Sequence, residues 1–142
     1  MKYLIDTCVI SELRRPQPDE GVVRFVEQTR FDHWLSVLTL GELLRGLNAM
    51  TPGKRRDELG RWIHQIEVDY SPRIVPIDQG TVHVWGEVTG ELRRKGIQVA
   101  TADGLIAATA IQHGMHVVTR NVKDFHPTGV PVINPWKDEN GP

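Results

Sequence analysis

Short apolar runs alternate with helical patterns along this chain, and the alternation limits the folds open to it. The runs lie at residues 2–6, 33–37, 73–77, 116–119 and 130–133. Parallel strands need a long crossover between them, which a helix usually supplies, so strands separated by helices predict parallel pairing. We therefore expect an α/β fold, specifically an α/β/α sandwich with a central parallel sheet flanked by helices.

The stretches between the runs place apolar residues at helical spacing. We expect one helix to begin after Asp19, which is a good N-cap residue, and two more to contain residues 40–47 and 59–66. Two further helices are expected at 79–95 and 101–112, the last of them buried because it is apolar almost all the way round. The proline in the 73–77 run predicts a strand at the edge of the sheet.

Length, charge and cysteine content exclude several classes of protein. The 142 residues fit one domain, expected at residues 1–136, with a polar, frayed tail at 137–142. Cys8 is the only cysteine, so no disulfide forms within the chain, and no apolar stretch approaches the length of a membrane span. A cytoplasmic location is expected. The net charge of −1 excludes a strongly basic nucleic-acid coat, so any such contact needs a local basic patch.

Acidic residues recur where the carboxyl ends of parallel strands would meet. They are Asp6, Glu42, Asp103 and Asp124. Ligands of open α/β sheets bind at this edge. Carboxylates gathered there would raise one another's pKa unless a cation intervened, and oxygen-only ligands favour Mg²⁺ or Mn²⁺ over zinc. This pattern predicts metal-assisted hydrolysis of a phosphodiester.

Each acid also has a purely structural interpretation. Asp6 can cap the helix that follows it, and the Thr39–Glu42 segment fits a capping box. Asp103 can be stabilised by a helix N-terminus with Thr101 as its cap. Asp124 can belong to a polar turn. The residues alone leave both interpretations open.

Other catalytic chemistries have less support. No second Asp stands two residues after Asp6, as a haloacid-dehalogenase-type phosphatase would need, and no Gly-rich phosphate loop follows a strand. His113 and His116 lack a second ligand pair for zinc. Cys8 has no evident His partner and is expected to be a small core residue.

Four sequence blocks resemble the signature segments of a known family. The blocks LIDTCVISEL, TLGELLRG, TADGLIAATA and VTRNVKDF occur in this order over nearly the whole chain. They are similar to those of PIN-domain ribonucleases, in particular the VapC toxins of VapBC toxin–antitoxin pairs and their FitB-like relatives. The resemblance implies a sheet in the order 3-2-1-4-5.

The resemblance also implies roles for individual residues. Asp6, Glu42 and Asp103 would form the acidic triad that holds Mg²⁺ or Mn²⁺, with Asp6 and Asp103 first among the direct ligands. Asp124 and Asn121 would complete the rim, and Thr7 and Thr119 would orient an acid or the attacking water. Many PIN domains carry an acid where this chain has Asn121, which leaves the binding of a second metal open.

The expected function is that of a Mg²⁺-dependent endoribonuclease, the toxin of a type II toxin–antitoxin pair, which cuts tRNA or rRNA and so inhibits translation. RNA phosphates would contact basic residues close to the acids, which are Arg14, Arg45, Arg120 and Lys123. By the resemblance, the partners would be a second copy of the chain, a VapB-like antitoxin whose tail lies in a groove near the acids, and operator DNA bound through that antitoxin. No membrane partner is expected.

Two questions stay open from the sequence. Trp62, Ile63 and Ile66 could serve the core or the antitoxin groove, because helical spacing does not distinguish them. The alternative function is a FitB-like regulatory module that has weak nuclease activity and binds promoter DNA with its antitoxin. A hydrolase of small phosphate esters is a third possibility, for which the chain has no nucleophile motif.

Overall fold

A parallel sheet forms the centre of the molecule in a computed structural model that describes residues 1–137. The strands are β1 (Lys2–Ile5), β2 (His33–Ser36), β3 (Ile74–Val75), β4 (Met115–Val118) and β5 (Val132–Ile133). They pair in the order β3-β2-β1-β4-β5, and every neighbouring pair is parallel. The expected order, with the first strand in the centre and the proline-containing run at an edge, is confirmed.

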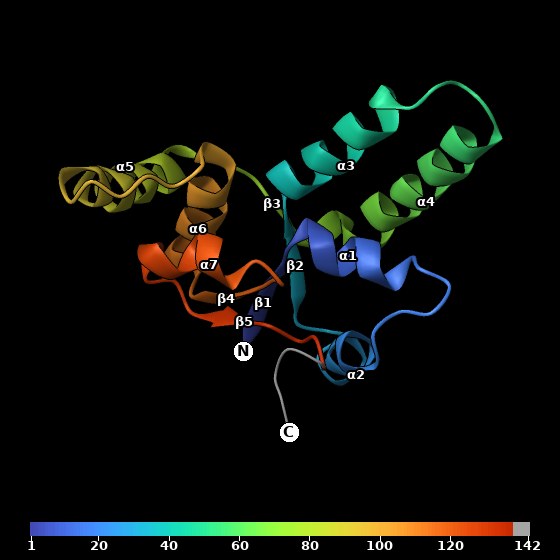
Figure 1. Cartoon of the computed structure of the whole chain (residues 1–142), viewed down its shortest axis with the longest axis horizontal. Coiled ribbons are helices and arrows are strands. Elements are labelled where there is room, and N and C mark those ends of the chain that lie inside the picture. The colour runs from blue at the N-terminus through green and yellow to red at the C-terminus, as the bar shows by residue number, and fades with distance from the viewer. Residues whose placement is uncertain (138–142) are drawn as a thin grey trace.

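Helices cover both faces of the sheet. They are α1 (Thr7–Leu13), α2 (Glu20–Gln28), α3 (Val37–Ala49), α4 (Lys54–Tyr70), α5 (Gln79–Arg94), α6 (Thr101–His113) and α7 (Val122–Phe125), with short 3₁₀ turns at Ser71–Arg73 and His126–Thr128. Figure 1 shows α5, α6 and α7 on one side of the sheet and α1 and α2 on the other. The hairpin of α3 and α4 projects away from the sheet (Figure 1).

The central strands bury side chains on both faces. Leu4 of β1 pairs in register with Val117 of β4, and both belong to the core beneath α6. The next residues, Ile5 and Val118, also pair, and they belong to the core beneath α1 and α2. Successive residues of a strand point to opposite faces, so two-sided burial explains why these strands read as continuous apolar runs.

The α3–α4 hairpin has a smaller core of its own. Leu40 and Leu43 of α3 pack with Ile63 of α4, and Leu47 lies against them. Leu44 is exposed, so the expected stripe of leucines on α3 is narrower than its spacing predicts. A hairpin with this limited core leaves much of its surface for other contacts.

Two expected helix caps are wrong. α3 begins at Val37, where Ser36 Oγ accepts the Leu38 N–H at 3.0 Å, so Thr39 lies inside the helix rather than at its N-cap. Ser36 is itself a good cap and directly follows β2, which starts the helix three residues earlier. α6 begins at Thr101, and its N-cap residue is Ala100, which offers no side-chain hydrogen bond. The caps at Asp6 and Asp19 are confirmed.

The end of the described chain returns to α2. The Lys137 N–H donates to Asp19 Oδ1 at 3.1 Å, and Lys137 Nζ lies 2.7 Å from Glu20 Oε2. The rest of the expected tail, residues 138–142, lies outside the described residues. Within residues 1–137, no helix combines the length and apolar character needed to cross a membrane.

Packing beneath α1 gives a stability prediction. Leu35 on β2 is fully buried, so Leu35→Ala is expected to lower the free energy of unfolding by about 2–5 kcal/mol. The matched change Leu44→Ala, at an exposed site on α3, is expected to alter it by less than about 0.5 kcal/mol. Urea denaturation followed by circular dichroism measures both. Equal losses would contradict the assignment of Leu35 to the core.

Candidate active site

Asp6 lies at the carboxyl end of the central strand and is fixed by hydrogen bonds on both carboxylate oxygens. Its Oδ1 accepts the Thr7 N–H at 2.9 Å, which caps α1, and its Oδ2 accepts the Thr119 hydroxyl at 2.7 Å. Thr119 directly follows β4 and is fully buried. Asp6 thus connects the carboxyl ends of β1 and β4 through hydrogen bonds, and it is only 7% exposed.

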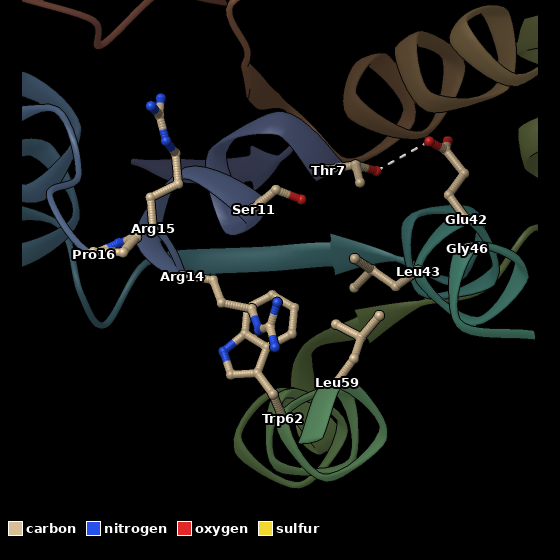
Figure 2. Close-up of a pocket in the computed structure, with 10 residues that line it drawn as sticks. All are labelled: Thr7, Ser11, Arg14, Arg15, Pro16, Glu42, Leu43, Gly46, Leu59 and Trp62. Carbon is tan, nitrogen blue, oxygen red and sulfur yellow. Dashed lines mark hydrogen bonds between the residues drawn. The ribbon is translucent and has the colours of Figure 1, made fainter. Parts of the chain in front are cut away.

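Glu42 reaches the same edge from α3. Thr7 Oγ1 donates to Glu42 Oε2 at 3.1 Å, which connects the start of α1 to the second turn of α3. Glu42 is exposed to solvent, and Figure 2 shows its side chain pointing toward Thr7. When a hydroxyl donates a hydrogen bond to one oxygen of a carboxylate, it fixes the direction in which the other carboxylate oxygen points.

Asp103 is the acid whose protonation the site changes most. Burial raises its pKa first, and the negative charges of Asp124, Asp6 and Glu42 raise it further, to about 6. Its neighbour Gly104 allows α6 to approach α5 closely, because a Cβ there would lie 3.0 Å from Trp85 Nε1. The structure thus brings Asp124, Asp6 and Glu42, the other three sequence-predicted acids, within electrostatic range of Asp103.

The donor set suits a hard cation. Within residues 1–137, no three His, Cys, Asp or Glu side chains form a ready-made metal cluster. Mg²⁺, however, usually takes only one or two carboxylates and keeps several of its waters. Burial first, and then the charges of Asp124, Asp6 and Glu42, raise the pKa of Asp103, so a cation at this edge would offset the repulsion, and the available ligands are oxygens. Asp6 and Asp103 therefore fit such an ion.

Asn121 and Asp124 lie on the turn after β4. The Asn121 N–H donates to Thr119 Oγ1 at 3.0 Å, so the hydroxyl that binds Asp6 is itself held by this turn. The short helix α7, which the sequence analysis treated as a turn, then carries Asp124. Both residues line a hollow of about 290 Å³ that also includes Arg120 and Lys123.

Cys8 contributes to the site in a way that the sequence analysis missed. Its Sγ lies 3.7 Å from Asp6 Oδ2 and 3.5 Å from Thr119 Oγ1, and it accepts the Arg120 N–H at 3.4 Å. Burial is the main cause that raises the pKa of the thiol, so Cys8 remains protonated and is not a nucleophile. Its position two residues after Asp6, in the first turn of a helix, was the available signal.

The expected basic residues separate into different surroundings. Arg14, directly after α1, lies over the ring of Trp62 at 5.5 Å from its centroid. Arg120 lies over the Trp136 ring at 5.3 Å. Arg45 is exposed on α3, outside the lining of the hollow beside α7 and of the groove described next.

A groove of about 450 Å³ opens next to the acids (Figure 2). Thr7 and Glu42 form part of its wall, and α1, α3 and α4 contribute the rest. Trp62 is half-buried and lines this groove while it also packs against the core beneath α1, whereas Ile63 is buried in the hairpin core. Ile66 packs against the core beneath α1, so Trp62 is the one of these three residues that lines the groove.

The sheet order β3-β2-β1-β4-β5, with acids at its carboxyl edge, is the arrangement that the resemblance in the sequence implies. The chain belongs to the PIN-domain family, which matches residues 3–128. PIN-domain ribonucleases generally use divalent metal ions, and the resemblance noted in the sequence is confirmed.

Curated relatives and solved structures agree with this assignment. The chain is 37% identical to "Toxin FitB" of Neisseria gonorrhoeae, over 95% of this chain and 99% of that protein. It is 35% identical to "VapC ribonuclease Y4jK" of Sinorhizobium fredii, over 94% and 97% of the two chains. The crystal structure of FitAcB from Neisseria gonorrhoeae superposes with a TM-score of 0.88 at 37% identity, over 95% of this chain and 99% of that chain.

The raised pKa of Asp103 gives a pH prediction for the metal-free protein. The folded state holds this proton to about pH 6, whereas an aspartic acid with its ordinary pKa of 3.8 releases it about two pH units lower. The contribution of Asp103 to stability is therefore fully present below about pH 4 and is lost as the pH rises to about 6. In EDTA, Asp103→Asn is expected to raise the Tm relative to wild type at pH 7.5, and the difference should shrink towards pH 4.

Thermal denaturation by circular dichroism measures this difference. The control is Glu67→Gln, which changes an exposed acid on α4 and should show little dependence on pH. A Tm difference for Asp103→Asn that stays constant from pH 4 to 7.5 would contradict the charge repulsion at the site.

Proposed function

We propose that this chain is a Mg²⁺-dependent endoribonuclease and the toxin of a type II toxin–antitoxin pair, which acts on tRNA or rRNA in the cytoplasm and so inhibits translation. The observation that carries this proposal is the electrostatic grouping of Asp103 with Asp124, Asp6 and Glu42. The names of the relatives, among them a VapC ribonuclease and the tRNA(fMet)-specific endonuclease VapC of Salmonella typhimurium, support an RNA substrate.

Asp6 and Asp103 would hold the ion directly, with Glu42 as the third acid of the triad. A divalent ion bound there lowers the pKa of a bound water and stabilises negative charge on the phosphoryl oxygens. Thr119 holds Asp6 in place through its 2.7 Å hydrogen bond, and Thr7 holds Glu42 through its 3.1 Å hydrogen bond. Such fixed geometry lowers the reorganisation needed when charge develops in the transition state.

The rim would position the substrate strand. Asn121 and Asp124 lie in the same hollow as Arg120 and Lys123, so cations stand beside the acids where a phosphate chain must pass. On the side of Glu42, Arg14 lines the same groove as this acid and would contact a phosphate there. Arg45 would contact phosphates farther along the strand, from the exposed face of α3.

The proposed partners are a VapB-like antitoxin, a second copy of the chain, and operator DNA bound through the antitoxin. Solved complexes of similar chains support the antitoxin and the DNA, since they include FitAcB and a FitAB complex bound to an IR36 DNA fragment. The FitAB complex with DNA contains a chain that is 37% identical to this one and superposes with a TM-score of 0.87.

The same complex favours a second candidate function. A FitB-like regulatory module would bind promoter DNA together with its antitoxin and would cut RNA only weakly. Expression of the chain without its antitoxin distinguishes the two, because only an active toxin is expected to arrest growth. The nuclease stays the first proposal because Asp124, Asp6 and Glu42 lie close enough to Asp103 to raise its pKa.

Cleavage of RNA tests the nuclease directly. Purified chain, free of antitoxin, is expected to give discrete products from total tRNA or rRNA in Mg²⁺ and none in EDTA. Asp103→Asn should lower the rate at least about 100-fold without loss of fold, because it removes charge but little volume. Gel mapping of end-labelled RNA measures the products. Equal rates for folded Asp103→Asn and wild type would contradict the assigned site.

The hydroxyl of Thr119 gives a test of positioning. Thr119→Val removes the hydrogen bond to Asp6 while preserving shape, so we expect kcat to fall about tenfold with KM changed less than twofold. Thr119→Ser keeps the hydroxyl and should restore kcat. Steady-state cleavage assays measure both constants, and a serine variant as slow as the valine variant would assign Thr119 to packing alone.

A further inference from the structure

The groove beside the acids combines an aromatic face with cations. Trp62 of α4 lies at its wall with the guanidinium of Arg14 stacked over the ring, 5.5 Å from the centroid. Within residues 1–137, no acid forms an ion pair with Arg14, whereas Arg15 at the same rim pairs with Glu12 at 3.2 Å. Leu43 and Leu59 point into the groove from α3 and α4 and make its floor apolar (Figure 2).

The groove and the acidic site are continuous. Thr7 and Glu42, which are joined by a hydrogen bond of 3.1 Å, belong to both. An RNA strand bound at the acids can therefore place its neighbouring nucleotide directly in the groove. The volume of about 450 Å³ lies within the range of about 300–1,000 Å³ usual for small-molecule sites, so it can hold a nucleoside.

We propose that this groove is a base-binding subsite of the nuclease. It takes one unstacked nucleobase of the RNA strand that crosses the acids, with the base stacked on the Arg14–Trp62 pair and the adjoining phosphate near Arg15. This inference rests on the proposed function, because RNA is the substrate assigned there. It makes Trp62 a determinant of where the strand lies, and hence of which bond meets Asp6 and Asp103.

The chemistry of the lining favours a base over an apolar protein segment. Single-stranded nucleic acids are bound by aromatic rings and guanidinium planes next to cations, and this combination is present here. Ser11 and Thr7 add hydroxyl groups that can bond to the edge of a base. The groove shares Thr7 and Glu42 with the acidic site, so an RNA substrate bound at the acids would also reach the groove.

Binding of short RNA tests the subsite separately from cleavage. In the inactive Asp103→Asn protein, fluorescence anisotropy gives the Kd for labelled hexaribonucleotides of adenine, cytosine and uracil. We expect Trp62→Leu to weaken binding about tenfold, since stacking on an aromatic ring is lost while apolar bulk remains. Trp62→Phe keeps a ring and should stay within about threefold of the parent protein. Arg14→Ala should also weaken binding.

The control is Arg61→Ala, which removes an exposed cation from α4 outside the groove and should leave Kd nearly unchanged. Circular dichroism confirms that each variant is folded. A Kd that is the same for Trp62→Leu and Arg61→Ala would overturn the subsite. If Trp62→Leu instead loses only the binding of the cognate antitoxin, the groove belongs to a protein partner and the proposal is wrong.

The two proposals fail in different ways. A wild-type chain that cuts no RNA in Mg²⁺ but binds hexaribonucleotides through Trp62 would reject the nuclease function and support the groove. A chain that cuts RNA with no dependence of Kd on Trp62 would support the nuclease and reject the groove.

Discussion

Partial burial of Asp103, next to three other carboxylates at one edge of the sheet, is the constraint on which the site depends. Burial and three neighbouring acids raise the pKa of Asp103 to about 6, so the fold makes ionisation of this carboxyl less favourable than it is in water. The chain achieves this by fixing the acids on different elements. Asp6 is held by the Thr119 hydroxyl and the Thr7 N–H, and Asp103 lies on α6, which Gly104 allows to pack closely against α5. Strain of this kind is expected where a site is built for a charged ligand.

The fold was largely predictable because its strands bury both faces. Leu4 and Ile5 face opposite layers, so apolar runs with no alternation predict parallel strands from the sequence alone. Helix starts were less predictable. The Thr39–Glu42 segment has the letters of a capping box, but Ser36 ends β2 and starts α3 first, so tertiary context decided between two good caps. Thr101 is not the N-cap of α6 because the helix begins at Thr101 itself, so the N-cap is Ala100.

The sequence predicts that these acids gather at one edge of the sheet because strand ends can be read from it, but it does not predict the hydrogen bonds that connect them to other elements. The hydrogen bond between Thr7 and Glu42 joins residues 35 positions apart, and the contact of Cys8 with Thr119 joins residues 111 apart. Spacing along one helix or strand carries no information on such pairs. The groove around Trp62 was ambiguous for the same reason, since it is formed where α1 meets the α3–α4 hairpin.

The edges of the sheet have a consequence for assembly. Both outer strands, β3 and β5, contain only two residues, and prolines stand beside them at positions 76 and 131. An edge this short presents too few backbone N–H and C=O groups for another chain to extend the sheet. Partners of this molecule must therefore recognise side chains on helices and grooves, and specificity resides in those surfaces. The same short edges protect a free chain from aggregation through strand addition whenever its partner is absent.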